Sequence, residues 1–174
     1  LIHWKLADTY FNMGRFSDSE KSFRAYLGVA EEENKKGVAR FRIAESYERR
    51  ALFEQARQSF GTFLGRHPSH RLFAQAQQRI AQSWIKEGQN WEAKKELKSA
   101  KRAVAIWSQF LKRYPVHPRA AEVQTQIAVF WANKEQWDKA IPAFQNVVNK
   151  YPRNRYGSQA QFAIARIYER AKKD

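Results

Sequence analysis

A chain of 174 residues is long enough for one compact domain or one short repeat array, and its net charge of +15 favours anionic partners. Apolar residues make up 43% of the chain, which excludes a disordered protein, and only 7 glycines and 5 prolines favour helices over sheets. The absence of cysteine excludes disulfides, thiolate zinc sites and thiol catalysis, and no apolar run is long enough to cross a bilayer.

A short motif recurs five times from the beginning of the chain to its end. It consists of Leu or Ile, then Ala, and then a large aromatic residue three positions after the alanine. The alanines are Ala7, Ala44, Ala81, Ala128 and Ala165, spaced by 37, 37, 47 and 37 residues. Alanine and aromatic residue share one helix face, where the alanine lets a neighbouring helix approach closely. The motif therefore predicts five similar helices.

A second motif follows each of the first four copies. A small residue (Ser19, Ala56, Ala103 or Ala140) precedes an aromatic residue by four positions, and two further apolar positions complete one helical stripe. Proline then stops the helix in the last three of these units, at Pro68, Pro115 and Pro152. The first unit has Glu31 at that place, so we expect its second helix to run on or fray over residues 31–36. Each unit is a helix hairpin that can bury its stripe only by stacking on its neighbours.

This order of small residue, aromatic residue, turn, Ala, Phe and Pro resembles the tetratricopeptide repeat over essentially the whole chain, although the period is 37 rather than 34 residues. The joints, such as Tyr151-Pro152, are similar to those of Gram-negative envelope proteins of this superfamily, namely the lipoprotein of the β-barrel assembly machinery and the coordinator associated with the Tol–Pal system. The resemblance implies an all-α, right-handed superhelical solenoid of antiparallel helix hairpins with about nine helices.

We predict a single array over residues 1–174, with repeats at about 1–37, 38–74, 75–121 and 122–158 and a closing helix at 159–174. The third repeat holds ten extra residues within 89–102. They contain neither proline nor glycine, so we expect a helical hairpin that protrudes by about 7–15 Å. The chain opens inside a helix-like pattern, and we expect it to be part of a longer protein.

The resemblance also implies that the first helix of each hairpin lines a concave groove where partner peptides bind. Three rows of residues then face the groove: Lys5, Arg42, Arg79, Gln126 and Ala163; Asp8, Glu45, Gln82, Val129 and Arg166; and Asn12, Arg49, Lys86, Asn133 and Arg170. The first row opens with three basic residues, which predict either a ladder for a partner's carboxylates or ordinary ion pairs along and between helices. On the ladder interpretation, replacing Arg42 or Arg79 should change stability by no more than about 0.5 kcal/mol.

Positive charge is concentrated in the third repeat, where residues 75–121 hold ten Lys and Arg against three Glu. An aromatic-tipped basic hairpin there is a candidate contact element, while a tolerated insertion whose Trp91 and Leu97 only cover the local core is the alternative. The predicted partner-binding residues are Lys5, Arg42, Arg49, Arg79, Lys86, Trp91, Lys94, Lys95, Lys98, Lys101 and Arg102.

Catalytic and metal-binding motifs are missing from the sequence. His67 and His70 are close together but have no third ligand beside them, so a turn is the better interpretation, and we expect no enzyme, cofactor or metal site. The sequence predicts a scaffold or adaptor that binds an acidic protein or peptide in the periplasm or another part of the bacterial envelope, with the cytoplasm as the alternative. Binding of nucleic acid or anionic lipid through the third repeat is the second hypothesis, and self-association through the closing helix is a third.

Overall fold

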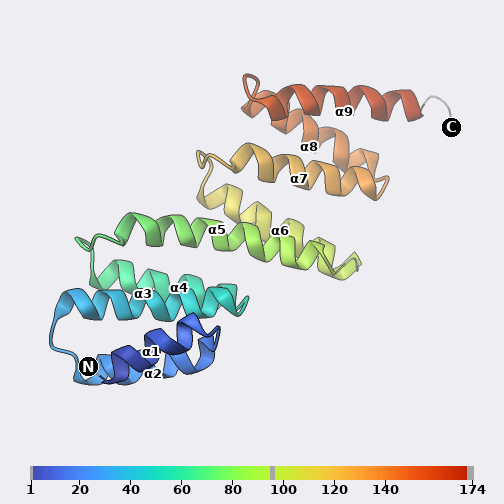
Figure 1. The fold of residues 1–174 in the computed structure, drawn as a ribbon. Coiled ribbons are helices and arrows are strands. Elements are labelled where there is room, and N and C mark those ends of the chain that lie inside the picture. Colours follow the sequence, from blue (N-terminus) through green and yellow to red (C-terminus); the bar gives the residue numbers. More distant parts are fainter. Residues whose placement is uncertain (1, 95–96, 172–174) are drawn as a thin grey trace. The chain divides into compact units, whose positions relative to one another are not determined.

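The computed structural model describes residues 2–94 and 97–171, and that part of the chain is all helical (Figure 1). It contains nine helices and no strand within these two ranges, as the repeat pattern predicts. The helices are α1 (Ile2–Asn12), α2 (Phe16–Val29), α3 (Glu33–Arg49), α4 (Phe53–Arg66), α5 (Phe73–Glu92), α6 (Leu97–Arg113), α7 (Ala120–Asn133), α8 (Trp137–Lys150) and α9 (Arg155–Ala171).

The helices form two compact units, Leu1–Glu87 and Gly88–Asp174. Within the first unit α1 pairs with α2 and α3 with α4, and within the second α7 pairs with α8 (Figure 1). A connection of three residues makes each of these pairs an antiparallel hairpin. Helix α5 begins in the first unit and its last turn belongs to the second. The single array over the whole chain stays a prediction.

The three hairpin turns share one backbone conformation. The left-handed region is occupied by Gly14 (φ 74°), Ala51 (φ 57°) and Glu135 (φ 55°), which stand at the same place in their turns. The next residue but one begins the second helix of the hairpin in each case. The reversal is therefore set by one left-handed residue, whether or not it is glycine.

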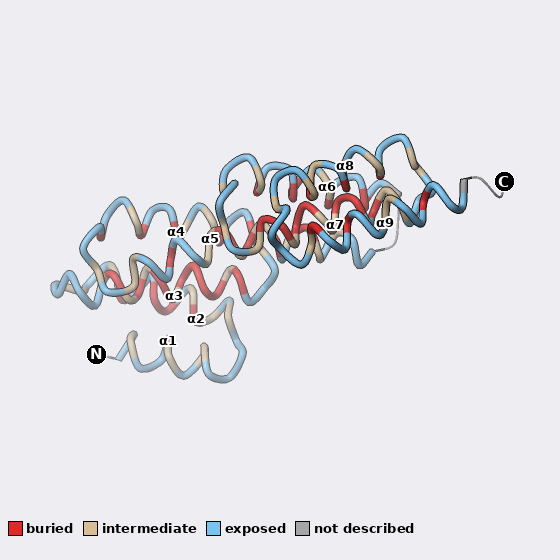
Figure 2. The backbone as a smooth tube through the Cα atoms, turned by 90° about the horizontal axis from the view of Figure 1, so that it is seen from above, coloured by how far each residue is buried: buried red, intermediate tan, exposed pale blue. Residues whose placement is uncertain are grey.

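The repeated small and aromatic residues form the cores of both units, and Figure 2 shows the buried residues along the helices that carry them. In the first unit Phe41 lies edge-on to Phe60 and Phe63, with ring centroids 5.2 and 5.7 Å apart. In the second unit Phe144 and Val147 pack with Ala128. The first motif's alanine is buried in α1, α3, α5 and α7 but exposed in α9.

The joints between hairpins confirm the predicted helix ends. Helices α4, α6 and α8 each stop two residues before the proline that the sequence places there. Aromatic rings fill two of these joints in the same way: Phe63 contacts His67 and His70, and Phe110 contacts Tyr114 and His117. The histidines therefore take part in packing.

The first joint differs from the prediction. Helix α2 ends at Val29 instead of running on, and α3 begins at Glu33, inside the charged run. At the start of α3 the ring of His70, from the next joint, rests against Gly37, and its Nε2 lies 3.2 Å from the carbonyl oxygen of Asn34. This contact holds the first turn of α3 in place.

The ten extra residues of the third repeat are shared between two helices. Helix α5 has 20 residues, against 17 in α3 and 14 in α7, and α6 has 17, against 14 in α4 and α8. The two helices cross closely, since a Cβ atom added to Gly88 would overlap the indole ring of the fully buried Trp107. Glycine at this crossing allows the longer hairpin to close.

Candidate functional site

Three of the predicted partner-binding residues lie in an ion-pair network inside the first unit. Arg79 of α5 donates hydrogen bonds to two carboxylates of α3, at 2.9 Å to Glu45 and 2.7 Å to Glu48. Lys86 donates to the second oxygen of Glu48 at 2.5 Å, and Arg42 donates to Glu45 at 3.0 Å. The network thus joins two buried glutamates to three cations.

The buried position of Glu48 makes this network structural. Its side chain is only 3% exposed. Burial acts to raise the pKa of the Glu48 carboxyl, but the hydrogen bonds and charges of Lys86 and Arg79 outweigh burial and hold the pKa below its ordinary value. Glu48 is therefore a carboxylate at neutral pH, and it neutralises the cations that the sequence assigns to the groove.

Arg42 makes further contacts, and two other predicted partner-binding residues of the first unit lie apart from the network. Arg42 also approaches Asp8 at 4.0 Å and stacks over the ring of Phe11 at 4.7 Å. Lys5 and Arg49 are exposed. The expectation that replacing Arg79 leaves stability unchanged is inconsistent with these contacts, because its removal would leave two buried carboxylates short of a partner.

The turn between α5 and α6 gathers the basic residues of the third repeat around one indole ring. Trp91 is half-buried, with Lys94 Nζ 3.9 Å and Arg102 Cζ 4.4 Å from its ring centre. Lys98 and Lys101 are exposed nearby in sequence on α6, while Lys95 lies outside the described residues. Cations that stack on an indole keep their charge available to an anion while the ring fixes their position.

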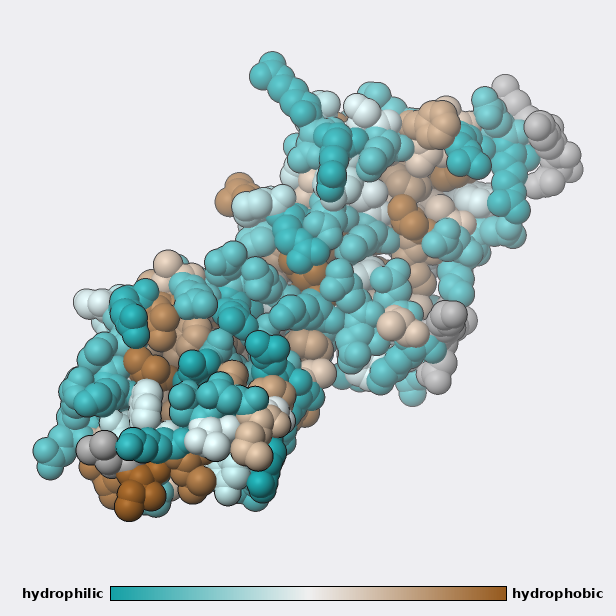
Figure 3. Space-filling model, viewed as in Figure 1, coloured by the Kyte–Doolittle hydropathy of each residue, from teal (hydrophilic) through white to brown (hydrophobic). Residues whose placement is uncertain are grey.

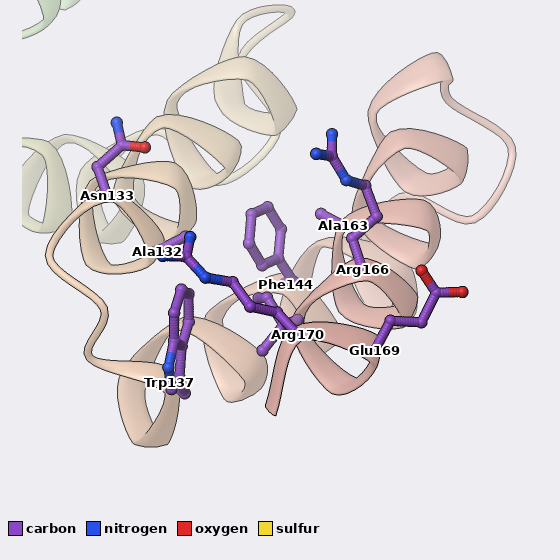
Figure 4. Close-up of a pocket in the computed structure, with 9 residues that line it drawn as sticks. Ala132, Asn133, Trp137, Phe144, Ala163, Arg166, Glu169 and Arg170 are labelled. Atoms are coloured by element: carbon purple, nitrogen blue, oxygen red, sulfur yellow. The ribbon is translucent and has the colours of Figure 1, made fainter. Parts of the chain in front are cut away.

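A concave pocket of about 440 Å³ opens among α7, α8 and α9 in the second unit (Figure 4). Four of its residues belong to the predicted groove rows: Asn133, Ala163, Arg166 and Arg170. Gln126 and Val129, the other members of these rows in α7, are not among its lining residues. The pocket is lined by Ala132, Asn133, Trp137, Phe144, Ala163, Arg166, Ile167, Glu169 and Arg170.

The pocket has an apolar floor and a charged rim. Phe144 and Ile167 are buried beneath it, and Figure 4 shows the ring of Phe144 between the side chains of Arg166 and Arg170. Arg170 donates to Glu135 at 2.7 Å, but both side chains are more than 60% exposed, so the pair is weak. Among the described residues Arg166 has no ion-pair partner.

None of the nine lining residues belongs to the predicted partner-binding set, and the two aromatic ones also lie outside the predicted groove rows. Trp137 begins α8 at the hairpin turn, and Phe144 belongs to the second motif, where the repeat assigns it to the core. The position of Trp137, directly after the turn and beside the end of the groove-facing helix α7, could have predicted that it lines the pocket. Phe144 gives no such signal, because the same residue serves both core and pocket.

His67 and His70 have ring centroids 6.1 Å apart, and their nitrogens are engaged by the protein. Arg40 Nη1 lies 2.9 Å from His67 Nε2, and the backbone N–H of Leu72 donates to His70 Nδ1 at 3.1 Å. Over residues 2–94 and 97–171 no group of three His, Asp or Glu side chains is placed to hold a metal ion. None of the helices in these ranges is both long and apolar enough to span a bilayer.

Hydrophilic side chains dominate the face of the molecule seen in Figure 3, in agreement with a mean hydropathy of −0.76. The larger exposed apolar side chains include Phe162 and Tyr168 of α9, which are 67% and 51% exposed. Contact surfaces in this chain are therefore defined more by charge and shape than by broad apolar area.

Comparison with known proteins identifies the repeat. Residues 38–70 and 122–154 match the family model of the tetratricopeptide repeat, and these segments cover most of the α3–α4 and α7–α8 hairpins. No curated protein sequence matches the chain.

Solved structures with a similar arrangement of helices are distant in sequence. BtubC from P. vanneervenii is 14% identical, with 96% of this chain and 70% of that chain covered and a TM-score of 0.47. MamA from Desulfovibrio magneticus RS-1 is 14% identical; the similarity covers 99% of this chain and 95% of MamA, with a TM-score of 0.43. The apo form of RapI is 16% identical; the similarity covers 85% of this chain and 54% of RapI, with a TM-score of 0.37. The match to the tetratricopeptide repeat is thus confined to residues 38–70 and 122–154, and over residues 2–94 and 97–171 the chain has an all-α hairpin fold.

Proposed function

We propose that this protein is a non-catalytic scaffold that binds a partner protein through the pocket among α7, α8 and α9. The observation that carries the proposal is the pocket's combination of an apolar floor, Phe144 and Ile167, with the arginines Arg166 and Arg170 at its rim. Tetratricopeptide arrays present extended concave surfaces to their partners, and this pocket lies on the groove-facing side of α7 and α9. Its volume of about 440 Å³ admits a large apolar side chain together with neighbouring residues of a peptide.

The chemistry of the rim indicates what surrounds that side chain in the partner. Guanidinium groups bind carboxylates through paired hydrogen bonds, so acidic residues next to the apolar anchor would meet Arg166 and Arg170. The network around Glu48 gives no comparable site in the first unit, because its cations are already paired. The partner segment is therefore an acidic peptide with one large apolar residue.

Peptide binding tests this proposal directly. A fluorescein-labelled peptide with Phe between pairs of Asp and Glu should bind, and the affinity should fall as ionic strength rises. Ala163→Trp, which fills the pocket, and Arg166→Glu, which reverses a rim charge, should each weaken binding by about tenfold or more. Arg153→Glu in the exposed joint between α8 and α9 is the matched charge control. Equal loss in Arg153→Glu and Arg166→Glu would contradict binding in the pocket.

A second candidate function rests on the cluster around Trp91. Lys94 and Arg102 stack on its indole ring, and Lys98 and Lys101 add exposed charge, which together suit a polyanion such as nucleic acid or an anionic lipid surface. Binding of single-stranded RNA, DNA and anionic vesicles should then show a steep salt dependence. The double variant Lys98→Glu/Lys101→Glu should abolish this binding, while Lys150→Glu on α8 should change the binding affinity little.

The compartment is part of the same proposal. The Tyr-Pro joints at residues 114–115 and 151–152 support a place in a bacterial envelope assembly, and the cytoplasm is the alternative. Fractionation of cells that express the full-length protein distinguishes the two, because the envelope assignment requires the protein to appear outside the cytoplasmic fraction.

A further inference from the structure

A polar hollow of about 290 Å³ lies in the first unit among α2, α3 and α4. Its apolar part is formed by Leu27 of α2 and the buried Ile43 of α3. Two arginines from the same two helices, Arg24 and Arg40, also line it. The hollow shares no residue with the pocket among α7, α8 and α9, so a substitution in one site leaves the other unchanged.

Arg40 is held at this hollow by a partner that carries no negative charge. Its Nη1 lies 2.9 Å from His67 Nε2, and because a guanidinium can only donate, this nitrogen of His67 is the acceptor. Burial and the charge of Arg40 lower the pKa of His67, so the ring is neutral at pH 7. The carboxylate of Glu33, which interacts with Arg40 at longer range, is paired with Lys36 at 2.7 Å. Burial and the charge of Arg66 lower the pKa of Arg40, and an anion beside it would act in the opposite direction.

Arg24 is the second cation that lines the hollow, and its charge is only partly balanced. It donates hydrogen bonds at 3.0 Å to the carboxylate of Glu20 and at 3.0 Å to the hydroxyl of Tyr47. Arg50 donates to the same carboxylate at 2.8 Å, so two cations share Glu20. Together with Arg40, three arginines stand against one carboxylate, which leaves an excess of two positive charges at the hollow and beside it.

Helix α4 supplies uncharged polar groups along one side of the hollow. Its lining residues are spaced by three, one and three positions, so they share one helix face: Gln55, Gln58, Ser59 and Thr62. Thr62 donates to the backbone carbonyl of Gln58 at 3.0 Å. Within the described ranges, the side chains of Gln55, Gln58 and Ser59 make no hydrogen bond to the protein, which leaves their amide and hydroxyl protons for a ligand.

We propose that this hollow binds the phosphate group of a small organic phosphate monoester. Arg24 and Arg40 bind the phosphate oxygens, and the amides of α4 donate further hydrogen bonds. The carbon part of the ligand lies on Leu27 and Ile43. A phosphate monoester carries about −1.5 to −2 charges at pH 7, which matches the excess of two, whereas a carboxylate balances only one. The volume of about 290 Å³ is at the lower end of the range for ligand sites, which favours a compact ligand over an extended peptide.

Calorimetric titration of the full chain with phenyl phosphate at low ionic strength tests the proposal. The wild type should bind with a Kd below about 1 mM. Inorganic phosphate lacks the carbon part and benzoate lacks the second charge, so each should bind about fivefold more weakly or worse. Gln58→Glu adds a negative charge at an exposed lining residue and should weaken binding about tenfold or more. Gln77→Glu makes the same change at an exposed position of α5 outside the hollow and should alter the Kd by less than about twofold.

Three results would overturn the proposal. The first is no binding of phenyl phosphate to the wild type at concentrations up to about 10 mM. The second is an equal loss in Gln58→Glu and Gln77→Glu, because the net charge of +15 then attracts phosphate without a defined site. The third is equal affinity for benzoate and phenyl phosphate, which would assign the hollow to a carboxylate. Arg40→Gln, checked for native helix content by circular dichroism, should also weaken binding about tenfold, and Gln58→Glu decides the outcome if that variant does not fold.

Discussion

Arg79 and Glu48 stand 31 residues apart in sequence and lie on adjacent helices, α5 and α3, with the guanidinium Nη1 2.7 Å from the carboxylate Oε2. The side chain of Glu48 is 3% exposed, and the side chain of Arg79 is 24% exposed. Arg79→Ala should therefore destabilise the first unit by about 1–3 kcal/mol, the usual range for a charged hydrogen bond at a buried partner. Urea denaturation of the wild type and of Arg79→Ala measures this difference in the free energy of unfolding. The exposed Arg49→Ala should stay within about 0.5 kcal/mol of the wild type, and equal stability of both variants would contradict the network.

The lowered pKa of Glu48 makes the network sensitive to acid. Because the carboxyl of the unfolded chain, with its ordinary pKa of 4.5, protonates before that of the folded chain, the network's contribution is complete above that pH and is lost as pH falls through the folded pKa. Glu48→Gln should melt at a lower temperature than the wild type at pH 7, and the difference should narrow below pH 4.5. Thermal melting across this range measures the difference. A wild-type advantage over Glu48→Gln that widens in acid would contradict the assignment.

The crossing of α5 and α6 requires glycine at position 88. Gly88→Ala places a methyl group against the buried indole of Trp107 and should destabilise the second unit by about 1–3 kcal/mol. Gly61→Ala is the matched control, since no atom lies within 4 Å of its added Cβ in α4. That variant should gain about 0.4–1 kcal/mol from the reduced freedom of the unfolded chain. Chemical denaturation followed by circular dichroism compares the two, and a neutral Gly88→Ala would rule out the close crossing.

The left-handed residues of the hairpin turns predict stabilising changes. Ala51 and Glu135 occupy a conformation that costs a residue with a Cβ about 1 kcal/mol, while Gly14 holds the same place in the first turn. Ala51→Gly and Glu135→Gly should each raise the free energy of unfolding by about 0.5–1 kcal/mol. Lys134→Gly, next to Glu135 but with φ −96°, should lower it instead. A loss of stability in all three variants would show that the turns do not depend on this conformation.

The sequence predicts the helices well because each carries its own periodic signal. The alanine and aromatic motifs place the hairpins, and Pro68, Pro115 and Pro152 mark where helices end. The first joint has no such residue. The helix that follows this joint, α3, is contacted near its start by His70, which packs on Gly37 from the next joint. No local pattern contains that information.

The sequence predicts the direction of single side chains better than it predicts the ion pairs between helices. Of the predicted groove rows, Asn133, Arg166 and Arg170 line the pocket of the second unit. Glu45 belongs to the same rows, but it is buried and paired with Arg42 and Arg79. Periodicity shows which way a side chain points, whereas a charge pair between helices depends on their separation and on the rotamers of long side chains.

Ala128 and Ala165 hold equivalent positions under opposite conditions, one sealed beneath α8 and the other open to water. The chain has no cysteine, so a thiol introduced at either position would be the sole reactive sulfur in the molecule. Alkylation of Ala165→Cys would proceed at the rate of an accessible thiol, whereas Ala128→Cys would react only when α8 detaches. The ratio of the two rates would therefore measure how often the α7–α8 hairpin opens locally.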